Sequence, residues 1–216
     1  MASRPKQAEP RPQPRLYLVT PEIADAAAFA APLAAALTAG DVAAVLLRLA
    51  PGDERGLINV VKDLAPLVQK HDAAVLVDGH PELVARGGAD GAHLGDLEAF
   101  EAAIDALKPE RIAGCGGLAT RHDAMVAAER GADYVMFGDP DRHGQRPDFT
   151  AIEERLGWWA EVFEAPCVGW AASLAEVAPL VKAGADFVAL GDWMWAEPAA
   201  NVAHAERFLA LPENVT

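Results

Sequence analysis

Carboxylates follow two short apolar runs of the sequence, at positions where they could bind a metal ion. Asp78 closes the run 75–77, and Asp96 and Glu98 come soon after the run 91–94. If these runs are neighbouring strands, the carboxylates meet at one edge of a sheet and could hold a divalent cation such as Mg²⁺. An ordinary structural role is also open to each acid. Asp78 fits a turn or a helix N-cap, and the other two fit the first turn of the next helix, where the helix dipole favours acids.

Basic and titratable side chains are expected at the same edge. Arg48 lies near the end of the run 42–49, and Arg142, His143 and Arg146 fall in one loop rich in Asp and Pro. An arginine fork binds two phosphate oxygens at once, so these arginines are candidates for holding an anionic substrate. The loop charges could instead pair in solvent with the aspartates beside them.

A repeated Gly-Ala-Asp motif indicates the elements that would position these side chains. Each copy ends an Ala-rich helical pattern and begins a short apolar run. Helix, glycine stop and buried strand in repetition are typical of a parallel barrel of alternating strands and helices. The copies lie at 88–90, 131–133 and 184–186. The predicted strands are 16–20, 42–49, 73–78, 91–94, 111–115, 134–137, 167–169 and 187–190. The first predicted helix ends at residue 40, and the later ones span 54–70, 82–86, 97–107, 149–163, 174–183 and 199–211.

About eight strand–helix units predict an α/β fold, a single (β/α)8 TIM barrel with parallel strands that close round an interior filled by side chains. An open doubly wound sheet has the same periodicity, but dinucleotide binding there normally needs a glycine-rich turn after the first strand. Residues 20–23 read T-P-E-I, and no G-x-G-x-x-G follows them. In a barrel the ligands bind at the carboxyl ends of the strands, so the residues that close each strand are the candidates for function.

Composition predicts one domain over residues 15–216, preceded by a disordered Pro-rich tail over residues 1–14. Of the 216 residues, 52% are hydrophobic, enough for one large core. The net charge of −14 argues against nucleic acid or an acidic membrane as a partner, and no apolar run approaches the roughly 20 residues of a membrane span. The two cysteines, Cys115 and Cys167, fit a reducing cytoplasm. An anionic substrate would therefore need a local positive site or a divalent metal.

Two tryptophans, Trp193 and Trp195, follow the last predicted strand and therefore belong to the functional end of the barrel. Their rings could stack on a heterocycle, form a hydrophobic lid or contact a second subunit. The sequence therefore leaves open whether the protein forms a homo-oligomer.

Several of these segments resemble the thiamine phosphate synthase family, whose sister group is the thiazole tautomerases. The resemblance covers nearly everything after Pro14. R-L-Y-L-V-T at 15–20 is similar to the family's opening strand, and V-L-L-R at 45–48 resembles its V-Q-L-R segment. The specific match is G-A-D-G-A-H-L-G at 88–95, which is close to the family's G-A-D-G-V-H-L-G.

The resemblance implies a transferase of thiamine biosynthesis that joins an aminopyrimidine diphosphate to a thiazole phosphate and releases pyrophosphate. It implies Mg²⁺ as cofactor and small phosphorylated heterocycles as partners. By position, Asp78 and Glu98 match acidic metal ligands, Arg48 matches the arginine that holds the diphosphate, and His93 matches the strand histidine. From the residues alone, His93 fits a packed histidine with one ring nitrogen bonded to a neighbour. No catalytic residue is assigned.

The departures from the family pattern fall on the segments expected to bind phosphate and pyrimidine. Leu46 replaces a glutamine, Val77 an asparagine, and residues 139–147 a P-T-x-T-K loop. Arg142 and Arg146 are then expected to bind substrate with a different geometry, beside Ser173 and Gly191. Two alternatives stay open. One is a noncatalytic barrel that binds a phosphate or a heterocycle. The other is an isomerase related to the thiazole tautomerases, whose proton-moving histidine would come from elsewhere, such as His122 or His143.

Overall fold

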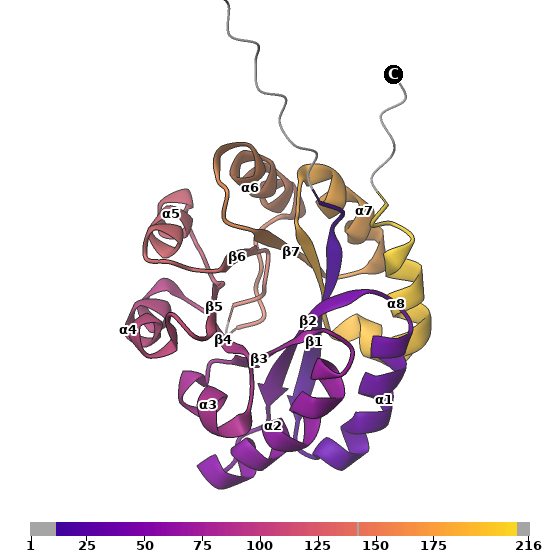
Figure 1. Cartoon of the computed structure of the whole chain (residues 1–216). Helices are drawn as coiled ribbons and strands as arrows, with labels where there is room; N and C mark the ends of the chain where they lie inside the picture. The colour runs from indigo at the N-terminus through magenta and orange to yellow at the C-terminus, as the bar shows by residue number, and fades with distance from the viewer. Residues whose placement is uncertain (1–11, 142, 211–216) are drawn as a thin grey trace, which may run out of the picture.

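A computed structural model describes residues 12–141 and 143–210. Its eight parallel strands pair in sequence order, and β8 pairs with β1, so the sheet closes into a ring (Figure 1). This confirms the predicted (β/α)8 barrel. The strands are β1 (Arg15–Ile23), β2 (Val42–Leu49), β3 (Ala74–Asp78), β4 (Gly91–Leu94), β5 (Ile112–Cys115), β6 (Tyr134–Phe137), β7 (Cys167–Ala171) and β8 (Phe187–Leu190).

The helices surround the ring of strands (Figure 1). They are α1 (Ala26–Thr38), α2 (Glu54–Gln69), α3 (Val84–Gly87), α4 (Leu97–Leu107), α5 (Arg121–Glu129), α6 (Phe149–Val162), α7 (Leu174–Ala183) and α8 (Pro198–Glu206), with two 3-10 turns, η1 (Pro81–Leu83) and η2 (Asp192–Ala196). Among the described residues, no helix is both long and apolar enough to cross a membrane. Of the predicted tail, residues 12–14 are described and precede β1 without regular structure, while residues 1–11 lie outside the described part.

Other element ends shift by one or two residues, and the predicted helix 82–86 is divided into η1 and α3; three elements differ more from the sequence-based prediction. Strand β1 runs on to Ile23, because a shift of register after Val19 lets it keep pairing with the end of β2. Helix α5 was given no range from the sequence, although Thr120 and Asp123 form a capping box at its start. Helix α8 ends at Glu206, short of the predicted residue 211, which is outside the described part.

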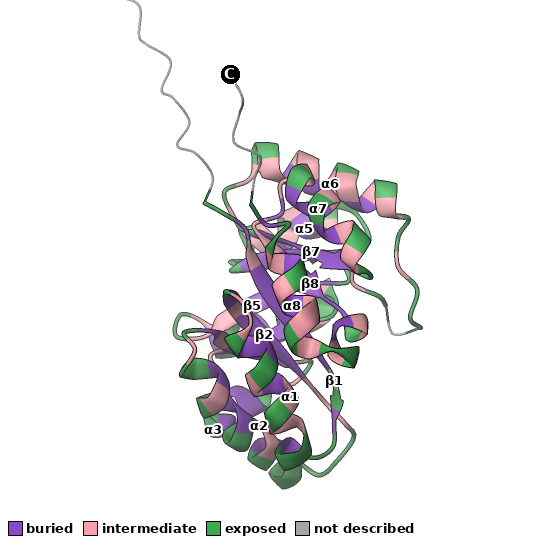
Figure 2. Ribbon diagram, turned by 90° about the vertical axis from the view of Figure 1, so that its right-hand side faces the viewer, coloured by how far each residue is buried: buried purple, intermediate pink, exposed green. Residues whose placement is uncertain are grey.

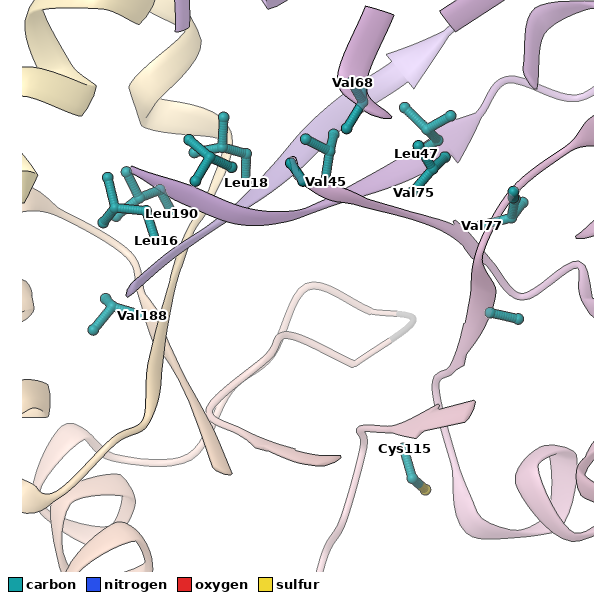
Figure 3. Close-up of a cluster of buried hydrophobic side chains, with 14 of the residues drawn as sticks. Leu16, Leu18, Val45, Leu47, Val68, Val75, Val77, Cys115, Val188 and Leu190 are labelled. Atoms are coloured by element: carbon teal, nitrogen blue, oxygen red, sulfur yellow. The ribbon is translucent and has the colours of Figure 1, made fainter. Parts of the chain in front are cut away.

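Alternation along the strands creates two apolar layers. Leu16 and Leu18 of β1 project outward with Val45 and Leu47 of β2, toward the helices (Figure 3). The intervening side chains point into the barrel and form a separate buried cluster. Buried residues therefore line both faces of the strands, and exposed residues lie on the outer faces of the helices (Figure 2). The inner cluster contains Tyr17, Val19, Ala44, Leu46, Leu76, Tyr134, Met136, Val168, Trp170 and Ala189.

The repeated Gly-Ala-Asp motif joins neighbouring strands at their amino-terminal ends. In each copy the aspartate carboxylate accepts the N–H of a residue near the start of the preceding strand, at 2.7 Å from Val75, 2.7 Å from Ala113 and 2.8 Å from Cys167. The backbone N–H of the same aspartate donates to that residue's carbonyl. These aspartates satisfy strand-end amides and do not line the pocket at the other end of the barrel.

Replacing Asp186 by Ala should destabilise the fold by about 1–3 kcal/mol, because the N–H of Cys167 loses its acceptor. Asp186→Asn should recover part of this loss, since the amide oxygen can still accept. The free energy of unfolding in urea measures both effects. Asp105→Ala, at an exposed position of α4, is the control and should change stability by less than about 0.5 kcal/mol. Equal losses in the two alanine variants would contradict this role for the motif.

Candidate active site

A pocket of about 570 Å³ opens at the carboxyl-terminal ends of the strands. The loop between β6 and α6 reaches across this end of the ring and forms part of its wall (Figure 1). The location is where barrels of this architecture bind their ligands. The lining residues are Val19, Glu22, Leu46, Arg48, Asp78, His93, Gly95, Asp96, Asp139, Pro140, Asp141, Gly144, Trp170 and Asp192.

The rim of the pocket carries an arginine between two carboxylates. Arg48 of β2 lies 3.2 Å from Asp192, which follows β8, and 4.0 Å from Asp78 at the end of β3. Burial raises the pKa of Asp78 above its ordinary value, and the charges of Arg48 and His80 oppose that rise. The Arg48 side chain is 31% exposed, so it remains accessible to a ligand that enters the pocket.

Beneath the pocket, His93, which lines it, connects to two buried tyrosines of the barrel interior. The Tyr17 hydroxyl lies 2.8 Å from the Tyr134 hydroxyl, which lies 3.0 Å from Nδ1 of His93. Burial lowers the pKa of His93 to about 4, so its ring is neutral at physiological pH. Gly114 makes room for this arrangement, since a Cβ there would lie 2.0 Å from the Tyr134 ring.

Asp139 brings a second buried titratable group to the floor. Its Oδ2 accepts the N–H of Gly117 at 2.8 Å. Burial raises its pKa to about 6, an effect opposed by the backbone N–H groups and reinforced by the charge of Asp78. Its Oδ2 and Nε2 of His93 each lie 2.6 Å from the point that a Cβ on Gly116 would occupy. The two groups are therefore neighbours, and the glycine is what allows them to approach.

The remaining wall of the pocket is apolar. Val19, Leu46 and the indole of Trp170 line it, and all three are buried. Trp170 sits on β7, and its ring also covers Gly191, where a Cβ would lie 3.1 Å from an indole carbon. A flat ring could therefore occupy the interior of the pocket between an apolar wall and the polar floor.

Charge is unevenly distributed in this pocket. Among the described residues that line it, six are acidic, whereas Arg48 is the one arginine and none is a lysine. Such a pocket repels a bare diphosphate but suits one that carries a divalent cation. The donor set fits Mg²⁺ in kind, because carboxylate oxygens are its preferred protein ligands and it is often bound by one or two of them together with substrate phosphates. No group of three or more His, Cys, Asp or Glu side chains suited to a metal was found in the described part of the chain.

Four of the residues singled out from the sequence line the pocket together: Arg48, Asp78, His93 and Asp96. Glu98 is exposed in the first turn of α4 and is not among the lining residues, whereas Asp96 is. Asp96 also caps that helix by accepting the N–H of Ala99 at 2.7 Å. Asp96 therefore combines a position at the pocket with a helix-capping role, whereas Glu98 has only the helix-start position.

The other predicted binding residues lie outside the pocket lining. Arg146 forms two hydrogen bonds to Glu176 and one to the carbonyl of Trp170, so it ties the β6–α6 loop to α7. Ser173 is exposed at the N-cap position of α7, and Gly191 is buried behind Trp170. Arg142 lies outside the described residues.

The two tryptophans after β8 are held by backbone carbonyls. The indole N–H of Trp193 donates to Ala171 at 2.9 Å, and that of Trp195 donates to Val19 at 2.7 Å. Trp195 also packs against Phe29, with ring centroids 4.7 Å apart. Neither side chain lines the pocket, where Trp170 provides the aromatic wall instead.

The fold and the pocket define a (β/α)8 barrel of the enzyme type, with titratable side chains gathered at the carboxyl ends of its strands. Comparison with known proteins then specifies the family. Residues 16–192 match the family model described as thiamine monophosphate synthase. The chain belongs to this family, which confirms the resemblance seen in its motifs.

Individual relatives agree with this assignment. A thiamine-phosphate synthase from Rhodospirillum centenum is 44% identical over 197 residues, covering 90% of this chain and 95% of the relative. One from Hyphomonas neptunium is 38% identical over 221 residues, covering 96% and 98%. Among solved structures, the thiamine phosphate pyrophosphorylase from Pyrococcus furiosus superposes with a TM-score of 0.72 at 22% identity, covering 91% of this chain and 96% of that one. This last likeness concerns the fold.

Sequence reasoning assigned no binding role to four side chains of the pocket region: Tyr17, Tyr134, Asp139 and Trp170. The tyrosines alternate with apolar residues in their strands, a signal for facing inward but not for polar pairing. Asp139 directly follows Gly138 after β6, so its place at a strand end could be predicted from the sequence. Its burial could not be predicted, because burial depends on the glycines after β5, 22 or more residues earlier in the chain.

The difference in unfolding free energy between the Asp139→Asn variant and the parent protein should shift in favour of the variant as pH rises. The folded-state pKa of about 6 exceeds the ordinary value of 3.8, so the folded parent binds more protons than the unfolded chain between these values and loses stability as pH rises through that window. The stability of the variant minus that of the parent should increase by up to ~3 kcal/mol between pH 4 and pH 7.

Urea unfolding of both proteins across this pH range measures the difference. The subtraction is needed because the lowered pKa of His93 gives the opposite slope, with stability rising between about pH 4 and 6.5. Asp78 also titrates nearby and is present in both proteins. A difference that does not change with pH would show that Asp139 is well solvated.

Proposed function

We propose that this protein is a thiamine phosphate synthase, which transfers the aminopyrimidine methyl group from its diphosphate to the nitrogen of a thiazole phosphate and releases pyrophosphate. Family membership across residues 16–192 carries this proposal. The curated relatives named above are thiamine-phosphate synthases of similar length, and this chain covers 95% or more of each.

The chemistry asks the site to stabilise charge and to position two rings. The bond between the pyrimidine methylene carbon and the diphosphate oxygen breaks, and both electrons leave with the diphosphate. The thiazole nitrogen then supplies the electron pair for the new C–N bond. No proton has to move, so the transfer needs no strong base, and positioning and charge stabilisation provide the rate enhancement.

We assign the charged rim to the diphosphate. Arg48 donates to its oxygens, which requires Arg48 to turn from Asp192, 3.2 Å away. Asp78 would contribute an oxygen to Mg²⁺, and the start of α4 would contribute the second acid, Glu98 or Asp96. Bound Mg²⁺ would neutralise charge that develops on the departing diphosphate. Arg142, Arg146, Ser173 and Gly191 remain proposed contacts for phosphate groups, with the Arg146 contact requiring release from Glu176.

No observation in the described part of the structure specifically favours the two alternatives, an isomerase or a noncatalytic binder. His122 and His143, which an isomerase would need for proton movement, are both exposed and do not line the pocket. The buried His93 has a lowered pKa and is a weak base. A noncatalytic binder differs from the transferase only in turnover, so an activity measurement separates them.

Purified protein supplied with both substrates and Mg²⁺ should form thiamine phosphate, measured by chromatography after oxidation to a fluorescent product. Chelation with EDTA should stop the reaction, and added Mg²⁺ should restore it. No product under conditions in which another family member turns over would remove the transferase proposal and leave the noncatalytic binder.

Asp78→Asn should abolish Mg²⁺-dependent binding of inorganic pyrophosphate, lowering the affinity by about 100-fold or more, while unfolding stays cooperative. Asp105→Asn, at an exposed position of α4, is the charge-matched control and should bind as the parent does. Calorimetry with and without Mg²⁺ makes the measurement. Glu98→Gln and Asp96→Asn, tested in parallel, decide which acid of α4 assists. Unchanged binding in Asp78→Asn would show that Asp78 is a turn residue only.

A further inference from the structure

Asp139 is a buried carboxyl of the pocket that the assigned reaction does not yet use. It is absent from the ion pairs of the described residues, and its carboxylate accepts the N–H of Gly117. A buried carboxylate without a cation beside it is costly unless it is hydrogen-bonded, and backbone N–H groups leave acceptor sites on Asp139 that a donor from a ligand could use. The apolar wall formed by Val19, Leu46 and Trp170 indicates that this ligand is a flat ring.

The neighbouring histidine fixes the character of Asp139 as an acceptor. The neutral ring of His93 carries one proton, and a carboxylate oxygen beside Nε2 favours that proton on Nε2. With that tautomer, Nδ1 accepts a hydrogen bond from the Tyr134 hydroxyl, and the Tyr134 oxygen can accept one from the Tyr17 hydroxyl. In this arrangement the donors of the buried chain run toward Asp139, whose carboxylate can also accept from a ligand.

Of the two proposed substrates, only the pyrimidine offers a matching donor. Its exocyclic amino group carries two N–H bonds, whereas the thiazole ring has none. We propose that Asp139 is the residue that recognises the aminopyrimidine, by accepting a hydrogen bond from its amino group while the ring lies against Leu46 and Trp170. His93 is a positioning residue in this arrangement, and the inference rests on the function proposed above.

The same contact assists the reaction. When the diphosphate leaves, the positive charge on the methylene carbon spreads through the ring onto the amino nitrogen, so its N–H becomes a stronger donor. A carboxylate accepting that hydrogen bond in a water-poor pocket stabilises the cation more than the ground state. Both amino protons stay on the nitrogen throughout, because the thiazole nitrogen ends the cation by forming the C–N bond.

Two ligands without phosphate test recognition apart from turnover. These are 4-amino-5-hydroxymethyl-2-methylpyrimidine and its analogue with hydrogen in place of the amino group, titrated by NMR or calorimetry. The parent protein should prefer the amino compound by about 10- to 100-fold, the effect of a hydrogen bond to a charged group. Asp139→Asn should reduce this preference to less than about 3-fold, and Asp105→Asn should keep it. A loss of affinity that is equal for both ligands would show a structural role and overturn the inference.

Steady-state kinetics provide the second measurement. In Asp139→Asn, kcat/KM for the pyrimidine diphosphate should fall by about 10- to 100-fold, and KM for the thiazole phosphate should stay within about 2-fold. If the parent turns over and the variant equals it, the inference fails while the proposed function stands. If the parent does not turn over, the proposed function fails. A preference for the amino ligand that disappears in Asp139→Asn would then still support this recognition role, and no preference would overturn it.

Discussion

Closure of eight parallel strands into one ring is the constraint on which the site depends. Because every strand runs in the same direction, all carboxyl ends reach one rim. At this rim Arg48 lies within ion-pair distance of both Asp78 and Asp192, although Asp192 is 144 residues further along the chain. The ring also sets the other end of the molecule, where the three Gly-Ala-Asp aspartates accept strand-end amides. The interactions that join the strand ends therefore lie at the opposite end of the barrel from the pocket.

Burial divides the pocket into two electrostatic regions. At the floor it acts against the charged forms of both Asp139 and His93, raising the pKa of the acid and lowering that of the base. Such surroundings suit an uncharged heterocycle that supplies a donor. At the rim, Arg48 and the carboxylates Asp78 and Asp192 remain at least 31% exposed and keep contact with water. A substrate with a neutral ring and an anionic tail fits this division, with the ring at the floor and the tail at the rim.

Much of this architecture could be predicted from the sequence, because buried parallel strands leave apolar runs that glycine and acid residues interrupt. The runs 42–49, 91–94, 134–137 and 187–190 agree with the observed strands. Arg48, Asp78 and His93 were found because each ends or occupies such a run. Glu98 shows the limit of spacing alone. Asp96 is the N-cap of α4 with an extended backbone and lines the pocket, whereas Glu98, in the first turn of the helix, does not line it. Asp139 and Trp170 stand at strand ends in the sequence, but no binding role could be assigned to them, because their roles come from contacts between distant strands and loops.

The charge balance of the pocket bears on how the substrate enters. Two unit charges about 4 Å apart interact by about 4 kcal/mol near a protein surface, so an excess of acids over basic residues in the described lining dominates the potential there. A free diphosphate would meet that potential as an anion of several charges. The same group complexed with Mg²⁺ brings two positive charges that the carboxylates attract, and Arg48 then needs to satisfy only the oxygens that remain. Arg48 is the one arginine of the described lining, so under the proposed function a diphosphate would bind best if it entered the site together with the metal.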